Sequence, residues 1–123
     1  MEVKSGILFK RGEGGLFKRK NWKRRYFKLT PTEFTYYCPN TGVVKGTVDL
    51  SECTVGALEI MPEDCPKTGK SASTEWRVAI NTPTRRFFIS APTEFEMQEW
   101  VDALMIVLQA FEKTRGSLCD LSP

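Results

Sequence analysis

Residues 10–29 read KRGEGGLFKRKNWKRRYFKL and carry much of the positive charge of the chain. The segment holds nine of the 18 Lys and Arg residues and one of the 15 acidic residues, so its local charge is +8 against +3 for the whole chain. Glycines at 12, 14 and 15 separate two strand-like stretches and predict a loop that runs to about Lys20. Such a concentration of positive charge attracts phosphate groups, nucleic acid or an anionic membrane.

The chain continues the β pattern on both sides of this loop. Alternating polar and apolar residues, bounded by turns rich in Pro, Gly and Asn, predict strands over 5–11, 21–30, 33–38, 43–50, 54–60, 75–81 and 85–90. Residues 61–73 are polar, contain two prolines and predict a surface loop. Several short strands at this spacing are typical of an antiparallel sandwich or barrel, so the fold is mainly β.

The period of the apolar residues changes after Pro92. Thr93 and Glu96 have the spacing of a capping box, and apolar residues then recur at helical spacing from Met97 to Phe111. A helix with one apolar face is suited to closing an open end of the barrel. We therefore expect a domain over 1–112 and a flexible tail or linker over 113–123.

Composition limits the chemistry that the chain can carry. Its 123 residues contain no histidine, which removes His-dependent nucleophiles and zinc sites. The four cysteines lack a CxxC pair, and the N-terminus lacks the hydrophobic region of a secretion signal, so we expect reduced thiols in a cytoplasmic protein. We expect no enzymatic activity, no cofactor and no metal.

Alternation also places basic residues on the same face as residues that must enter the core. Because such residues are tolerated there only beside water or a ligand, they indicate an open mouth of the barrel. For Arg25, an ordinary ion pair with a surface carboxylate is the alternative. The groupings along three strands are Lys10 with Leu8, Lys23 and Arg25 with Phe27 and Leu29, and Tyr36 with Phe34.

Four pieces of sequence, in this order, resemble the pleckstrin homology (PH) domain family over about residues 4–112. They are Gly6-x-Leu8-x-Lys10, Trp22 to Leu29 (WKRRYFKL), Phe34 to Tyr37 (FTYY) and Glu99-Trp100. The resemblance implies a seven-stranded, strongly bent antiparallel barrel or sandwich that one C-terminal helix caps. The glycine-rich basic loop is most similar to those of Bruton-type tyrosine kinases and some Ras GTPase-activating proteins.

The same resemblance implies a binding site for phosphoinositides. Members that bind 3-phosphorylated inositides carry a Lys on the first strand, a basic-x-Arg pair on the second and a Tyr on the third. The matching residues here are Lys10, Lys23, Arg25 and Tyr36, with Lys45 at a further basic position and Lys18 and Lys20 in the loop. Leu16 and Phe17 at the loop tip either fold back onto the barrel or enter the membrane interface.

We thus expect a monomeric module that binds a phosphoinositide headgroup, with preference for the 3,4,5-trisphosphate or 3,4-bisphosphate, and brings its protein to the plasma membrane. The alternative is a protein-interaction scaffold with weak, non-specific binding of acidic lipids. Binding of nucleic acid is the least favoured of the three, because alternation directs Phe27 into the core instead of toward a base.

Overall fold

The computed structural model describes residues 2–12, 21–64 and 73–120, with only the backbone described for 116–120. Secondary structure in these ranges follows the expected order of strands and one final helix. The elements are β1 (Lys4–Arg11), β2 (Trp22–Leu29), β3 (Phe34–Tyr37), β4 (Val44–Val48), a 3-10 helix η1 (Val55–Ala57), β5 (Leu58–Ile60), β6 (Arg77–Asn81), β7 (Arg86–Ser90) and α1 (Glu94–Asp120).

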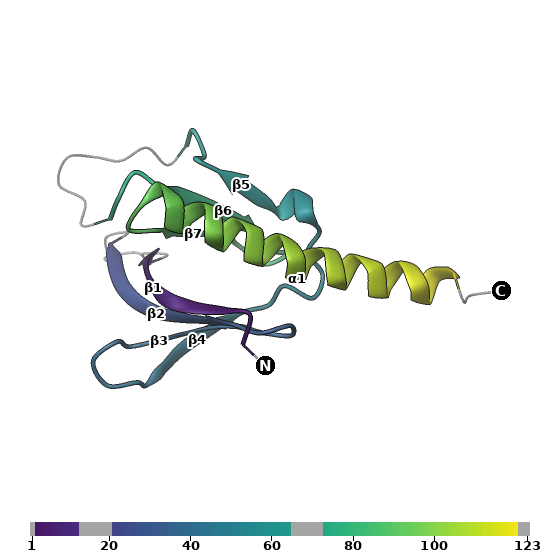
Figure 1. Cartoon of the computed structure of the whole chain (residues 1–123), viewed down its shortest axis with the longest axis horizontal. Helices are drawn as coiled ribbons and strands as arrows, with labels where there is room; N and C mark the ends of the chain where they lie inside the picture. Colours follow the sequence, from purple (N-terminus) through teal and green to yellow (C-terminus); the bar gives the residue numbers. More distant parts are fainter. Residues whose placement is uncertain (1, 13–20, 65–72, 121–123) are drawn as a thin grey trace.

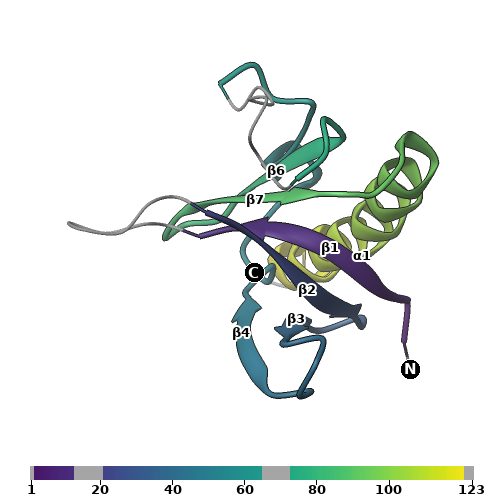
Figure 2. The ribbon, with the colours of Figure 1, turned by 90° about the vertical axis from the view of Figure 1, so that its left-hand side faces the viewer.

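All strands form one seven-stranded sheet in the order β4-β3-β2-β1-β7-β6-β5. Every neighbouring pair is antiparallel. Strand β1 joins two halves of the sheet, a first half of β1–β4 and a second half of β5–β7. It pairs with β2 along its length and with β7 at Phe9 and Lys10. The halves cross steeply in Figure 2, and α1 lies across the side between them in Figure 1. The expected mainly β fold with one capping helix is confirmed.

The core forms where the inner faces of both halves meet α1. Leu8 of β1, Phe27 of β2 and Phe34 of β3 are completely buried, which fixes the predicted alternation on these strands. The rings of Phe27 and Phe34 lie 5.0 Å apart, and Trp100 of α1 lies 5.9 Å from Phe34. The helix therefore covers the same apolar face that the basic residues of β1 and β2 share.

Helix α1 begins as predicted and ends later than predicted. The Thr93 hydroxyl accepts a hydrogen bond from the Glu96 N–H at 3.1 Å and caps the first turn. The helix continues to Asp120, so residues 113–120, which the sequence predicts as a loose tail, are helical. Arg115 donates hydrogen bonds to the carbonyl oxygens of Ser51 and Cys53, the latter at 2.6 Å. These contacts bind the last turns to a segment far away in sequence.

The fifth strand is shorter than the pattern over 54–60 suggests. A 3-10 turn occupies Val55–Ala57, and only Leu58–Ile60 pair with β6. The Val55 N–H donates to the carboxylate of Glu112 at 2.9 Å, so α1 also holds this segment. Within the described ranges, no helix has the length and apolar character that crossing a membrane requires.

Candidate functional site

Three basic residues meet where β1 and β2 approach their connecting loop. Lys10 lies directly opposite Lys23 in the register, and Leu8 lies opposite Arg25. Arg25 is therefore the diagonal neighbour of Lys10 on the face of the sheet that buries Leu8. Lys23 is exposed, whereas Lys10 and Arg25 are half-buried. The pairing of two adjacent strands thus gathers three cations at one end of the inner face.

Tyr36 lies on the other side of Arg25. It pairs with Phe27 across β2 and β3, which makes it diagonal to Arg25 on the same face. The Tyr36 ring stacks on Phe27 at 5.3 Å and contacts Phe87 at 5.8 Å. The Lys10 ammonium lies 5.0 Å from the ring centres of both Tyr36 and Phe87. These aromatic rings form a floor that holds the Lys10 ammonium by cation–π attraction.

Gly46 of β4 makes room for the Tyr36 side chain. The two residues are partners in the register of β3 and β4. A Cβ atom on Gly46 would lie 2.4 Å from the Tyr36 hydroxyl oxygen and 2.6 Å from Cζ. The end of the Tyr36 ring consequently occupies the space beside Gly46 that the side chain of any larger residue would need.

A cleft of about 360 Å³ opens beside this aromatic floor. It lies between β4 with its following residues and the turn 82–85, which leads into β7. Tyr36, Gly46 and Phe87 line its inner side, and Arg85 lines it from the turn. The Arg85 guanidinium lies 4.5 Å from the Phe87 ring centre. The cleft therefore continues the surface on which Lys10 rests.

Arg85 and Phe87 are site residues that the sequence prediction omitted. The alternation of Arg85, Phe87 and Ile89 is the same signal that identifies Lys10 beside Leu8, since Phe87 and Ile89 are buried. The signal was present in strand 85–90, but the significance of Arg85 depends on how the turn folds. Thr82 closes that turn by donating to the Arg85 carbonyl from its N–H at 2.9 Å and from its hydroxyl at 2.8 Å.

No described acidic residue neutralises the cation at the centre of the group. Arg25 donates one hydrogen bond from Nη1 to the carbonyl oxygen of Arg24 at 3.3 Å, and it forms no ion pair with any acid in the described ranges. A guanidinium with remaining donors can bind a phosphate or carboxylate in a bidentate manner. The alternative of an ordinary ion pair between Arg25 and a surface carboxylate has no support within the described part of the chain.

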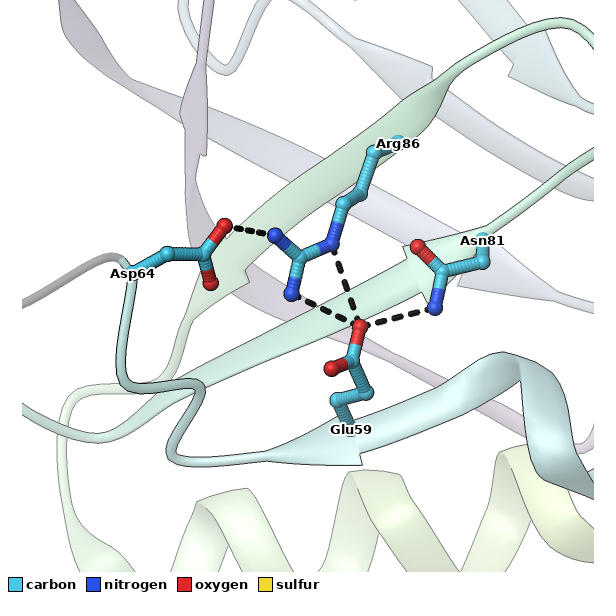
Figure 3. Close-up of polar contacts among 4 residues, drawn as sticks. All are labelled: Glu59, Asp64, Asn81 and Arg86. Atoms are coloured by element: carbon cyan, nitrogen blue, oxygen red, sulfur yellow. Dashed lines mark hydrogen bonds and ion pairs between the residues drawn. The ribbon is translucent and has the colours of Figure 1, made fainter.

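Arg86, in contrast to Arg25, is paired with acidic residues. Its guanidinium contacts the Glu59 carboxylate from Nη2 at 2.7 Å and from Nε at 3.1 Å, and it also pairs with Asp64 (Figure 3). Asn81 donates to the same Glu59 oxygen at 2.7 Å. The hydrogen bonds from Asn81 and Arg86 lower the pKa of Glu59. Arg86 is thus committed to a structural network on the outer face of β5–β7.

The remaining predicted residues divide into one peripheral residue and a group outside the described ranges. Lys45 is exposed and lies at an irregularity in the register, between the Tyr36–Gly46 and Tyr37–Val44 pairs. Among described residues it makes no hydrogen bond, ion pair or ring contact with Lys10, Lys23, Arg25 or Tyr36. Lys18, Lys20, Leu16 and Phe17 lie outside the described residues. No group of three metal-ligating side chains occurs in the described part of the chain.

Comparison with known proteins agrees with this architecture. The family model of the PH domain matches residues 2–109. The protein "Differentially expressed in FDCP 6" of mouse is 33% identical over 116 residues, which are 91% of this chain and 16% of that protein. This chain therefore spans about a sixth of the length of that relative.

Solved structures show the same likeness. The C-terminal PH domain of human pleckstrin superposes with a TM-score of 0.68 at 28% identity, covering 89% of each chain. The C-terminal PH domain of pleckstrin in complex with D-myo-Ins(1,2,3,4,5)P5 has a TM-score of 0.63 at 28% identity, covering 87% of this chain and 98% of that one. A PH domain is a non-catalytic module. With the family model matching nearly the whole described fold, the chain belongs to the PH domain family.

Proposed function

We propose that this PH domain binds the phosphorylated headgroup of a phosphoinositide at the group formed by Lys10, Lys23, Arg25, Tyr36 and Arg85. The observation that carries the proposal is the position of Arg25. It is half-buried on the inner face of the sheet, diagonal to both Lys10 and Tyr36, and without an acidic partner among the described residues. A cation in that position is best satisfied by an anionic ligand.

Each side chain has a distinct part in this proposal. The Arg25 guanidinium binds one phosphate through two parallel N–H donors. The Lys10 ammonium, held over the rings of Tyr36 and Phe87, acts as a point charge between neighbouring phosphates. The Tyr36 hydroxyl donates to a further phosphate oxygen. Lys23 on β2 and Arg85 in the turn 82–85 contribute positive charge from two sides of this group of residues, which we call the mouth.

The proposed preference is for 3-phosphorylated inositides, and the proposed destination is the plasma membrane. The support is the set of Lys10, Lys23-x-Arg25 and Tyr36, which resembles the pattern of PH domains that bind those lipids. A pleckstrin domain of similar fold is described in complex with an inositol pentakisphosphate. Lys18, Lys20 and Lys45 add to the attraction of an anionic leaflet, at about 1 kcal/mol for each basic residue near the surface. Leu16 and Phe17 are proposed membrane contacts.

The test is sedimentation with vesicles that contain 5% of the 3,4,5-trisphosphate lipid in a phosphatidylcholine background. Arg25→Ala removes a charge-assisted bidentate contact that contributes about 1.5–3 kcal/mol to binding. The affinity for the vesicles should therefore fall about 10- to 100-fold. Arg24→Ala is the matched control, because Arg24 is exposed on the opposite face of the same strand. It should lower binding only slightly. Equal losses for both variants would mean that general charge, and not this site, causes binding.

A protein-interaction scaffold is the second candidate function. The observation that favours it lies on α1, where Phe95 and Ile106 are exposed at 73% and 62%. Ile106 follows Phe95 by eleven positions, which is about three helical turns, so they lie near one face of the helix and a partner could cover both. In the vesicle assay, a scaffold would show weak binding that does not discriminate between phosphoinositides and other acidic lipids.

A further inference from the structure

The two walls of the cleft beside Tyr36 carry opposite charges. Arg85 lines the wall that the turn 82–85 forms. The rings of Tyr36 and Phe87, over which the Lys10 ammonium lies, line the cleft floor. Asp49 and Glu52, which follow β4, line the facing wall. Both acidic residues are exposed, and neither forms an ion pair among the described residues. A ligand that fills the mouth therefore meets cations on one side and carboxylates on the other.

Hydrogen bonds fix this acidic wall in place. The N–H and hydroxyl of Ser51 donate to the same Asp49 oxygen at 3.0 and 2.6 Å, which orients the carboxylate. Arg115 of α1 binds the carbonyl oxygens of Ser51 and Cys53, the residues on either side of Glu52. The wall cannot easily move away from an approaching anion, because the Asp49 side chain and the backbone on both sides of Glu52 are anchored.

We propose that Asp49 and Glu52 are specificity-determining residues that limit how many phosphates the mouth accepts. The preferred ligand is an inositol ring whose adjacent phosphates face β1, β2 and Arg85, and which turns free hydroxyl groups, such as those at positions 2 and 6 of the 1,3,4,5-tetrakisphosphate, toward the acidic wall. The inference rests on the proposed function, since it concerns the same site. It adds a restriction that the basic residues alone do not impose.

The different chemistry of hydroxyl and phosphate groups supports this preference. Ring hydroxyls can donate hydrogen bonds to carboxylates, which only accept them. A phosphate in the same place carries about −1.5 to −2 charge and has no comparable donor, so it meets electrostatic repulsion. Because the cleft is open to water, this repulsion is partly screened and modest. The acidic wall thus favours a partly phosphorylated ring over a fully phosphorylated one.

The test compares inositol 1,3,4,5-tetrakisphosphate with inositol hexakisphosphate by calorimetry at 0.15 M salt. The variant Asp49→Asn/Glu52→Gln keeps the shape of the wall and removes both charges. We expect the affinity for the hexakisphosphate, relative to the tetrakisphosphate, to rise about tenfold, because the two carboxylates no longer repel the added phosphates through water. The control variant Glu33→Gln/Glu75→Gln makes the same change in net charge at exposed residues that do not line this cleft. It should raise both affinities slightly and equally.

The possible outcomes separate this inference from the proposed function. If the wild type binds the tetrakisphosphate and the ratio of affinities is the same in both double variants, the acidic wall does not select the ligand, although the binding site stands. If the wild type binds neither compound, and vesicles of the 3,4,5-trisphosphate lipid do not bind either, the proposed function fails together with the inference. A ratio that rises only in Asp49→Asn/Glu52→Gln supports the proposal.

Discussion

Gly46→Ala tests whether the Tyr36 ring needs the bare backbone of β4. The added Cβ would lie 2.4 Å from the Tyr36 hydroxyl oxygen, whereas ordinary contacts begin at 3.4 Å, so the ring must move by about 1 Å. The ring cannot move alone, because it stacks on Phe27 and contacts Phe87. Overpacking of this kind costs about 1–3 kcal/mol. The lower backbone entropy of alanine returns roughly 0.5–1 kcal/mol.

The expected net loss is about 1–2 kcal/mol of unfolding free energy, which lowers the urea midpoint by about 0.5–1 M. Gly56→Ala is the matched control, since its nearest atom would be the Thr54 hydroxyl oxygen at 3.4 Å. That variant should change the midpoint little. Headgroup affinity should fall in Gly46→Ala, because the platform under the Lys10 ammonium shifts with Tyr36.

A double-mutant cycle isolates the contact. In a Tyr36→Ala background the Gly46 Cβ has no ring to displace, so Gly46→Ala should cost close to nothing. The account of the aromatic floor is wrong if Gly46→Ala destabilises the protein equally with and without the Tyr36 ring. It is also wrong if Gly46→Ala leaves both the urea midpoint and the binding of inositol tetrakisphosphate unchanged.

Three further predictions concern residues away from the mouth. Hydrogen bonds from Thr41 lower the pKa of the Cys38 thiol to about 7, while burial raises that of Cys53. In a Cys65→Ser/Cys119→Ser background, iodoacetamide should therefore modify Cys38 first, at a rate that is half-maximal near pH 7; equal rates at both thiols would contradict this. The lowered pKa of Glu59 means that its ion pair with Arg86 stabilises the fold above the ordinary glutamate pKa of 4.5 and is lost as the pH falls through the lowered value. The urea midpoints of wild type and Glu59→Gln should accordingly differ at pH 7 and converge under strongly acidic conditions; a gap that persists there would refute this assignment. Arg115→Ala removes two hydrogen bonds to backbone carbonyls and should destabilise the protein by about 1–2 kcal/mol, whereas exposed Lys113→Ala should not.

The sequence predicts strands β1–β3 well, because their apolar side chains must face the core and this allows only one alternation along each strand. Leu8, Phe27 and Phe34 are too apolar to face water, and their alternation fixes the direction of every neighbour. Once the strands pair, the placement of Lys10 and Arg25 on the inner face follows. The order of seven strands and a final helix was predictable for the same reason, since the apolar period changes from two to helical spacing after Pro92.

Features that depend on distant contacts could not be predicted in this way. The end of α1 is stabilised by Arg115 bonding to a segment more than 60 residues earlier, and no local pattern contains that contact. The cleft requires β4 and the turn 82–85 to approach each other, so Arg85, Asp49 and Glu52 acquire a shared role only in the folded chain. Lys45 shifts to the periphery because of an irregular register that alternation cannot show.

The most direct test of the central claim is an NMR titration of the ¹⁵N-labelled domain with soluble inositol 1,3,4,5-tetrakisphosphate. If Lys10, Arg25, Tyr36 and Arg85 form one binding mouth, the largest shifts should fall on the end of β1, the beginning of β2, the end of β3 and the turn 82–85. Arg25→Ala should raise the ligand concentration at half-maximal shift by about 10- to 100-fold, while the spectrum of the free domain is retained. Shifts that concentrate on the exposed face of α1 around Phe95 and Ile106, or a titration midpoint that is unchanged in Arg25→Ala, would contradict the account.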